Sequence, residues 1–271
     1  MIVPATDFHS HPRDICSKLS EQGLYIDRDN QQEFINYLQR EMKRAPSADS
    51  VNTPGWLTSG VYVLPGEVFG DQESGRFVHY CGDVNEYKQQ GTLSEWQREV
   101  ATPCLGNSRL IHAICAGFAG PLMLDAAESS GGSHFYGETS KGKTTALLVG
   151  GSVCGGGDPL IGFATNWRTT PNGMEPVLAG RNDGGVFFDE IGQAEPDSVS
   201  ELIYTVSGNI GKGRMTRELG KAKSLRWRVQ VLSTGELTLA AHAKKAGVNL
   251  RGGAAIRIID IPADAGRPGS L

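Results

Sequence analysis

The stretch of this sequence that decides the fold reads Gly137-Glu138-Thr139-Ser140-Lys141-Gly142-Lys143-Thr144. It matches the phosphate-binding pattern G-x-x-x-x-G-K-[ST] at every fixed position. The two glycines let the backbone bend so that several N–H groups point at one anion, and a following helix adds its positive dipole end. We expect Lys143 to reach the β- and γ-phosphates of ATP and the Thr144 hydroxyl to hold Mg²⁺. Residues 137–145, which end at Thr145, are called the phosphate loop below.

The neighbours of the phosphate loop support this interpretation. Residues 133–136 form a short apolar and aromatic run that predicts a strand, and residues 145–149 predict a helix that stops at Gly150-Gly151. Because 36 of the 271 residues are glycine, an ordinary glycine-rich turn is the alternative.

A second motif follows at residues 185–190, Gly-Val-Phe-Phe-Asp-Glu. A continuous apolar run is typical of a buried parallel strand, and ligands bind at the carboxyl ends of such strands. We expect Asp189 to hold Mg²⁺ through water and Glu190 to act as the general base that orients the attacking water. A surface acidic pair is the alternative for these two residues taken alone.

Composition limits the class of protein. The net charge is −4, so no global basic field indicates nucleic acid, and any contact with it must come from a local patch. No apolar run is long enough to span a bilayer, and Met1-Ile2-Val3-Pro4 leads into polar residues and not into a signal peptide. The five cysteines are scattered without C-x-x-C spacing. We expect reduced thiols in a cytoplasmic protein that does not enter a membrane.

The chain divides into two expected parts. Residues 1–120 form a helical and β-rich N-terminal region, with helices near 17–23, 31–42, 93–100 and 109–119 and short strands between 51 and 90. Gly120-Pro121 is expected to interrupt the last of these helices. From 121 to 271 strands and helices alternate, with strands expected at 134–136, 161–166, 186–189, 228–233 and 255–261. This alternation predicts an α/β core with a parallel sheet.

Several strings resemble the family named domain of unknown function 927, which is carried by phages, plasmids and integrated mobile elements and described as helicase-like ATPases and inactivated derivatives. These strings cover residues 137–145, 166–170, 189–193, 208–214, 232–236 and 257–264, with further likeness at 55–56 and 91–96. More distantly the chain resembles AAA+ replicative helicases. The resemblance implies an AAA+-like P-loop ATPase that forms a homo-oligomeric ring, such as a hexamer, and moves on DNA.

The same resemblance implies roles for other residues. A polar residue at the end of the strand after the acid strand senses the γ-phosphate in such proteins, and Ser233 or Thr234 fits this role; a simple turn is the alternative. Asn166 is the candidate for steering the catalytic glutamate. Arg251 and Arg257 are candidates for an arginine finger that acts on the neighbouring subunit, with a structural ion pair as the alternative for each.

A basic segment lies between the acid strand's helix and the next strand. From 208 to 228 it places seven basic residues against one acid, Glu218. In the resembled helicases an insertion here contacts single- or double-stranded DNA through its phosphates. The expected contacts come from Lys212, Arg214, Arg217, Lys221 and Lys223, with Arg226 and Arg228 nearby. The alternatives are a solvated loop or a loop that contacts ATP.

The sequence therefore predicts ATP hydrolysis coupled to translocation on DNA. Two other functions stay open: a nucleotide-binding scaffold without helicase activity, and a P-loop kinase that acts on a small molecule. The chain ends at Leu271, soon after the last expected strand, so the helical lid of AAA+ proteins is expected to be absent or truncated.

Overall fold

The structure is a computed structural model that describes residues 7–10, 12–44, 48–58, 60–70, 77–82, 86–158, 160, 162–213, 224–250, 252–264 and 266. The chain forms two compact units. One contains Met1–Val51 and Gly70–His79, and the other contains Asn52–Phe69 and Tyr80–Leu271.

The described residues of the smaller unit form three helices and, apart from Tyr80 at its end, a two-stranded sheet. The helices are α1 (Asp7–Ser10), α2 (Pro12–Glu21) and α3 (Gln31–Met42), and the strands are β1 (Ala48–Val51) and β5 (Phe77–Tyr80). Gly23 follows α2 with φ +93°, and the next N–H bonds back to the Leu19 carbonyl at 3.0 Å. This is the glycine helix end that the sequence predicts, although α2 begins earlier than expected.

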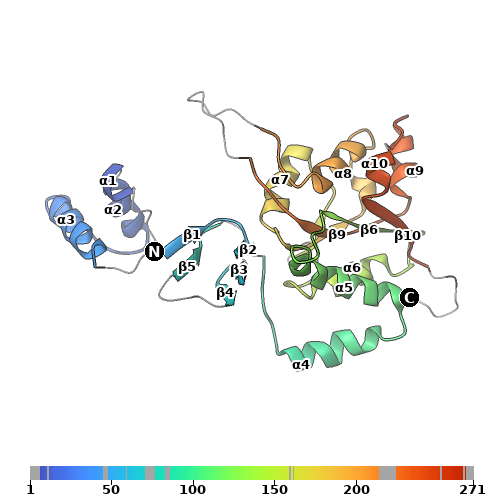
Figure 1. The fold of residues 1–271 in the computed structure, drawn as a ribbon, viewed down its shortest axis with the longest axis horizontal. Coiled ribbons are helices and arrows are strands. Elements are labelled where there is room, and N and C mark those ends of the chain that lie inside the picture. The colour runs from blue at the N-terminus through green and yellow to red at the C-terminus, as the bar shows by residue number, and fades with distance from the viewer. Residues whose placement is uncertain are drawn as a thin grey trace. The chain divides into compact units, whose positions relative to one another are not determined.

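The larger unit is organised around a five-stranded parallel sheet (Figure 1). Its strands are β6 (Gly131–Tyr136), β7 (Thr165–Asn166), β8 (Gly184–Asp189), β9 (Val229–Gly235) and β10 (Ile258–Pro262), in the spatial order β10-β6-β9-β8-β7. Strand β9 thus lies between β6, which leads into the phosphate loop, and β8, which carries the acids.

Helices cover both faces of this sheet (Figure 1). Helices α5 (Ser108–Leu122) and α6 (Lys143–Gly151) pack on the face where Phe135, Phe187 and Leu232 are buried. The helices of the other face are α7 (Pro171–Ala179), α8 (Val199–Ser207) and α9 (Leu239–Lys244), with α10 (Gly252–Ala255) beside α8. There they bury Val186, Phe188 and Val231, because successive residues of a strand point to opposite faces. The P-loop NTPase fold expected from the sequence is confirmed.

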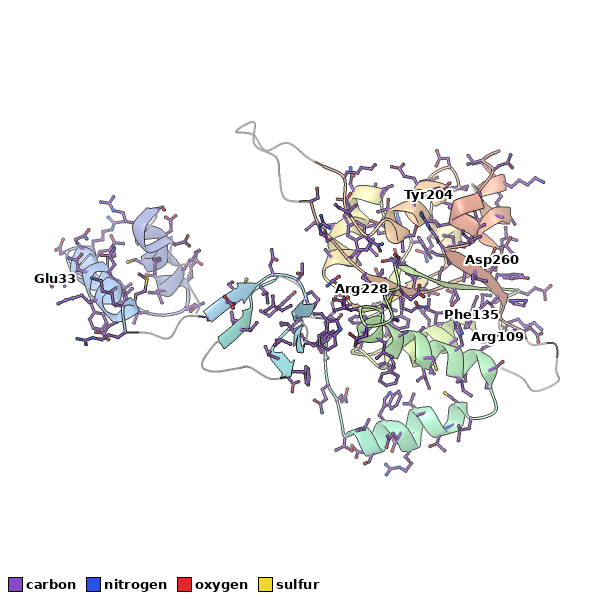
Figure 2. All side chains as sticks on the ribbon, viewed as in Figure 1. Glu33, Arg109, Phe135, Tyr204, Arg228 and Asp260 are labelled. Atoms are coloured by element: carbon purple, nitrogen blue, oxygen red, sulfur yellow. The ribbon has the colours of Figure 1, made fainter. Side chains whose placement is uncertain are left out.

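A three-stranded sheet of β2 (Gly55–Thr58), β3 (Val61–Leu64) and β4 (Glu67–Gly70) belongs, apart from Gly70, to the larger unit. It is anchored by Asp183, a buried residue just before β8. The Asp183 carboxylate accepts the N–H of Trp56 at 3.0 Å and pairs at 2.6 Å with Arg228, which is labelled in Figure 2. A Cβ on Gly55 would lie 2.6 Å from the same carboxylate, so this close approach requires glycine.

Helix α4 (Leu93–Trp96) begins with a capping box between Thr92 and Glu95 and continues through η2 (Gln97–Ala101) and η3 (Thr102–Cys104).

The interruption expected at Gly120-Pro121 is wrong, since α5 runs to Leu122 with Pro121 inside it. Pro121 lies in the last turn, where it costs only one helical hydrogen bond.

Two strand expectations need correction. The strand expected over 161–166 is only the pair Thr165–Asn166 within the described residues, because Gly162 and Phe163 bond to Asp158 and Gly156 in a turn. The strand expected from 255 starts at Ile258, because Ala255 ends α10. Helix α6 includes Gly150 and Gly151, which were expected to stop it, and η4 (Ile191–Gln193) follows β8 unexpectedly.

The packing of α5 on β8 predicts a large cost for a small change. A Cβ on Gly120 would lie 2.4 Å from the backbone of Gly184. We expect Gly120→Ala to lower the free energy of unfolding by about 2 kcal/mol, because overpacked sites force backbone shifts. Urea denaturation measures this change. Cys115→Ala, at an exposed position of α5, is the control and should change stability by less than about 0.5 kcal/mol. An unchanged midpoint for Gly120→Ala would show that the contact is not close.

Candidate nucleotide site

The phosphate loop connects β6 to α6 with the backbone bend that the motif predicts. Gly142 caps the helix with φ +77°, and Ser140 also has a positive φ of 66°. The N–H of Gly137 bonds to the carbonyl of Gly235 at the end of β9, at 3.2 Å. The Lys143 ammonium donates to the carbonyls of Gly137 and Glu138 at 2.6 and 2.7 Å, so it lies across the loop.

Two acids hold the loop from outside. The Thr139 hydroxyl donates to Glu236 at 3.1 Å, and Lys141 pairs with Asp264 at 2.8 Å. The hydrogen bond from Lys141 lowers the pKa of Asp264, and the same bond raises the pKa of Lys141. Lys141 is therefore engaged by a carboxylate, whereas Thr144 and Thr145 are exposed in the first turn of α6.

The acid pair lies at the same carboxyl edge of the sheet as the loop. Asp189 ends β8, and Glu190 follows it with a left-handed backbone, φ +47°. The Thr234 hydroxyl donates to Asp189 Oδ1 at 2.7 Å and accepts the N–H of Glu190 at 3.1 Å. The Glu190 carboxylate accepts the N–H of Gly192 at 2.9 Å. Of the two sensor candidates, Thr234 contacts both acids.

Asn166 lies beside this pair. It is the register partner of Asp189 in the β7–β8 pairing, and its side-chain oxygen accepts the N–H of Arg168 at 2.9 Å. The structure thus brings Asn166, Asp189, Glu190 and Thr234 to one edge of the sheet, next to the phosphate loop.

The structure places one of the two arginine candidates, Arg257, away from the phosphate loop. Arg257 precedes β10, and its carbonyl accepts the N–H of Gly132 at the opposite end of β6 from the phosphate loop. Its guanidinium lies 5.5 Å from the ring centre of Tyr204, which is labelled in Figure 2, and 3.4 Å from the Ser207 hydroxyl. A finger that acts on a neighbouring subunit does not need to lie near its own phosphate loop. Arg251 is outside the described residues.

The basic segment has an antiparallel stem. Ile210 pairs with Arg226, and the N–H of Gly211 bonds to the Leu225 carbonyl at 2.8 Å. Lys212 is held at the base of the stem: its N–H bonds to Glu175 at 2.9 Å, and its ammonium pairs with Glu201 at 2.5 Å. The other four expected DNA contacts lie outside the described residues: Arg214, Arg217, Lys221 and Lys223. Arg228 pairs with the buried Asp183 and is a structural residue.

The sequence analysis missed a cluster of buried polar side chains beneath the carboxyl edge of the parallel sheet. His134, Ser233 and Trp167 are each about 0% exposed. The Ser233 hydroxyl lies 2.8 Å from both His134 Nδ1 and Trp167 Nε1. A histidine inside the apolar strand that leads to the phosphate loop was the available signal.

The residues at the edge fit a nucleotide with Mg²⁺. The Thr144 hydroxyl and the Asp189 carboxylate supply the oxygen ligands that Mg²⁺ prefers. Within the described residues no group of three histidines, cysteines or acids could hold a metal ion. Mg²⁺ usually binds through one or two protein ligands and substrate phosphates, so these two residues would be enough.

Comparison with known families identifies the chain. The family described as "Domain of unknown function (DUF927)" matches residues 1–227, and the chain belongs to this family. No match was found among curated proteins.

Of three solved structures that match this chain, one has a similar fold. A structure titled "SCCmec type IV Cch - active helicase" has a TM-score of 0.69 and 22% identity, over 93% of this chain and 47% of that one. The chain therefore spans about half the length of that helicase. NtrX from Brucella abortus with ADP matches 62% of this chain and 39% of its own, at 16% identity and a TM-score of 0.34. The Hsp104-ADP complex of S. cerevisiae matches 63% of this chain and 36% of its own, at 14% identity and a TM-score of 0.36.

In the part of the chain that the structure describes, no helix is both long and apolar enough to cross a membrane.

The buried histidine predicts a pH dependence of stability. Burial lowers the pKa of His134 to about 4 from its ordinary value of 6.5. The unfolded chain therefore takes up this proton first as the pH falls, so the stability present above pH 6.5 is lost progressively toward pH 4. We expect protonation of this histidine in the unfolded chain to lower the free energy of unfolding by about 2 kcal/mol between pH 8 and pH 5.

Urea denaturation of the wild type and of His134→Gln at the two pH values checks this expectation. The glutamine cannot titrate, so the loss between pH 8 and pH 5 should be smaller in the variant by about 2 kcal/mol. The same pH dependence in both proteins would contradict it.

Proposed function

We propose that this member of the DUF927 family is an ATPase whose hydrolysis cycle drives movement on DNA, as a ring-forming helicase-like motor of a phage or mobile element. The observation that carries the ATPase part is the position of Thr234, which contacts both Asp189 and Glu190 on the strand next to the phosphate loop. A sensor, a metal-binding acid and a base at one sheet edge are the parts that phosphoryl transfer to water requires.

In this proposal each residue has a defined task. The loop N–H groups and Lys143 hold the β- and γ-phosphates of the substrate, and Thr144 and Asp189 hold Mg²⁺. When bound there, Mg²⁺ neutralises charge that develops on the phosphate oxygens. Glu190 accepts a proton from the attacking water, and Asn166 orients its carboxylate. Lys141 is paired with Asp264, so we assign it to shaping the loop.

The motor part of the proposal has separate support. The fold is similar to that of a protein described as an active helicase, and the basic segment extends from a paired stem beside α7 and α8. Because Lys212 is paired with Glu201, we expect Arg214, Arg217, Lys221 and Lys223 to supply most of the contact with DNA phosphates. Arg251 or Arg257 would complete the site of the next subunit in a ring.

The domain boundary is also a proposal. The sequence places the ATPase core at residues 121–271. Helix α5 starts at Ser108 and packs on α6 and β8, so we propose to include it in a core that begins near residue 108.

Steady-state ATP hydrolysis with and without single-stranded DNA tests the proposal. We expect hydrolysis that rises with DNA and falls by at least about 100-fold in Lys143→Ala and in Glu190→Gln, since each removes a group that acts on the reacting phosphate or water. Glu190→Gln should still bind ATP, because the phosphate loop is unchanged.

Lys245→Ala, on an exposed lysine after α9, is a matched control and should keep the wild-type rate. Bound ATP without hydrolysis would favour a nucleotide-binding scaffold. A hydrolysis rate that is the same with and without DNA would contradict the motor part of the proposal but not the ATPase part.

A further inference from the structure

A continuous network of three hydrogen bonds, two buried and one partly buried, runs beneath the carboxyl edge of the sheet. Trp167 Nε1 lies 2.8 Å from the Ser233 hydroxyl, which lies 2.8 Å from His134 Nδ1. His134 Nε2 lies 2.9 Å from the carbonyl of Leu237. The members come from β6, from β9 and from the segments that follow β7 and β9.

The chemistry of the partners fixes the direction of each bond. A carbonyl only accepts, so His134 Nε2 carries the ring proton and Nδ1 of the neutral ring accepts. The hydroxyl of Ser233 therefore donates its one proton to His134, and it accepts the N–H of Trp167. Every polar atom of the three side chains is satisfied in this single arrangement.

Two members of this network, Ser233 and Trp167, each lie one residue from a group of the proposed site. Ser233 precedes Thr234, which contacts Asp189 and Glu190. Trp167 follows Asn166, and its backbone N–H reaches the carbonyl of Asp189 at 3.4 Å.

On the other side, Leu237 follows Glu236, whose carboxylate accepts the hydroxyl of Thr139 in the phosphate loop. The His134 ring also packs against Gly235, where a Cβ would lie 3.1 Å from its Cε1 atom. The carbonyl of Gly235 accepts the N–H of Gly137. The ring thus lies against the end of β9, where Gly235 and Glu236 each bond to the phosphate loop.

We propose that His134 is a positioning residue for ATP hydrolysis: with Ser233 and Trp167 it fixes the distance between the phosphate loop and the acid pair. The proposal rests on the ATPase function above. Polar side chains buried in a core are costly unless every bond is made. The network is complete only when the loops hold this arrangement, so it favours one geometry of the site over others that an apolar core would tolerate.

The test separates positioning from general stability through kcat and KM. We expect His134→Gln and Ser233→Ala to lower kcat about tenfold or more while KM for ATP changes less than about threefold, because small misplacements of reacting groups carry large kinetic costs. Trp167→Phe removes the N–H donor together with part of the buried indole ring, so its kcat is read only in the folded variant. It serves as the milder variant and should lower kcat at least about threefold.

His242→Gln is the matched control. His242 is also a buried histidine whose Nε2 lies 3.1 Å from a backbone carbonyl, that of Ala194, but it is not part of the chain of bonds. It should lower the melting temperature while kcat stays within about threefold of wild type. All rates are measured below the melting temperature of each variant.

Wild-type kcat in folded Trp167→Phe and Ser233→Ala overturns the positioning proposal and leaves the ATPase proposal intact. An equal loss of kcat in His242→Gln also overturns it, because the effect would then follow stability alone. A wild-type protein without hydrolysis overturns the ATPase proposal, and the positioning proposal with it.

Discussion

The hydroxyl of Thr234 joins the two halves of the proposed site. It gives its proton to Asp189 at 2.7 Å and accepts the N–H of Glu190 at 3.1 Å. Glu190 has a left-handed backbone, which costs free energy for a residue other than glycine. The bond that the Glu190 N–H donates to Thr234 and the bond that its carboxylate accepts from the Gly192 N–H help to offset that cost and hold the glutamate where the apolar strand ends. This hydroxyl thus adds a side-chain tie between the acids and β9, the strand whose last residue, Gly235, bonds to the start of the phosphate loop.

The order of the strands makes this junction possible. Because β9 lies between β6 and β8, its carboxyl end is adjacent both to the start of the phosphate loop and to the acid pair. Gly137 bonds to Gly235, and Thr234 bonds to Asp189, so consecutive residues of one strand serve the two sides. Ligands bind at the carboxyl ends of parallel strands for this reason, since side chains from separate segments converge there.

The sequence was sufficient for features that depend on local pattern. The glycines and Lys143 of the phosphate loop, and the apolar run that ends at Asp189, predict their elements because backbone bending and burial leave direct marks in the sequence. Pro121 and the short β7 were misjudged, since tertiary packing decides where a marginal element ends.

Other features could not be read from the sequence because they depend on contacts between distant segments. His134 looks like an ordinary strand residue until Ser233 and Leu237 are placed beside it. The same holds for Lys212, whose charge is paired with Glu201, and for Arg228, which is paired with the buried Asp183. Both residues add to the count of basic residues in the segment, but each forms an ion pair with an acid of the same chain.

The central claim is that the phosphate loop and the acid pair form one site for ATP with Mg²⁺. Calorimetric titration of the chain with a non-hydrolysable ATP analogue, with Mg²⁺ and then with a chelator, tests it most directly when Asp189→Asn is measured in parallel. The account predicts that Mg²⁺ tightens binding about tenfold or more in the wild type and that this gain is largely lost in Asp189→Asn. Binding that is equally strong with and without Mg²⁺, or a Mg²⁺ effect that survives the substitution, would contradict a shared site.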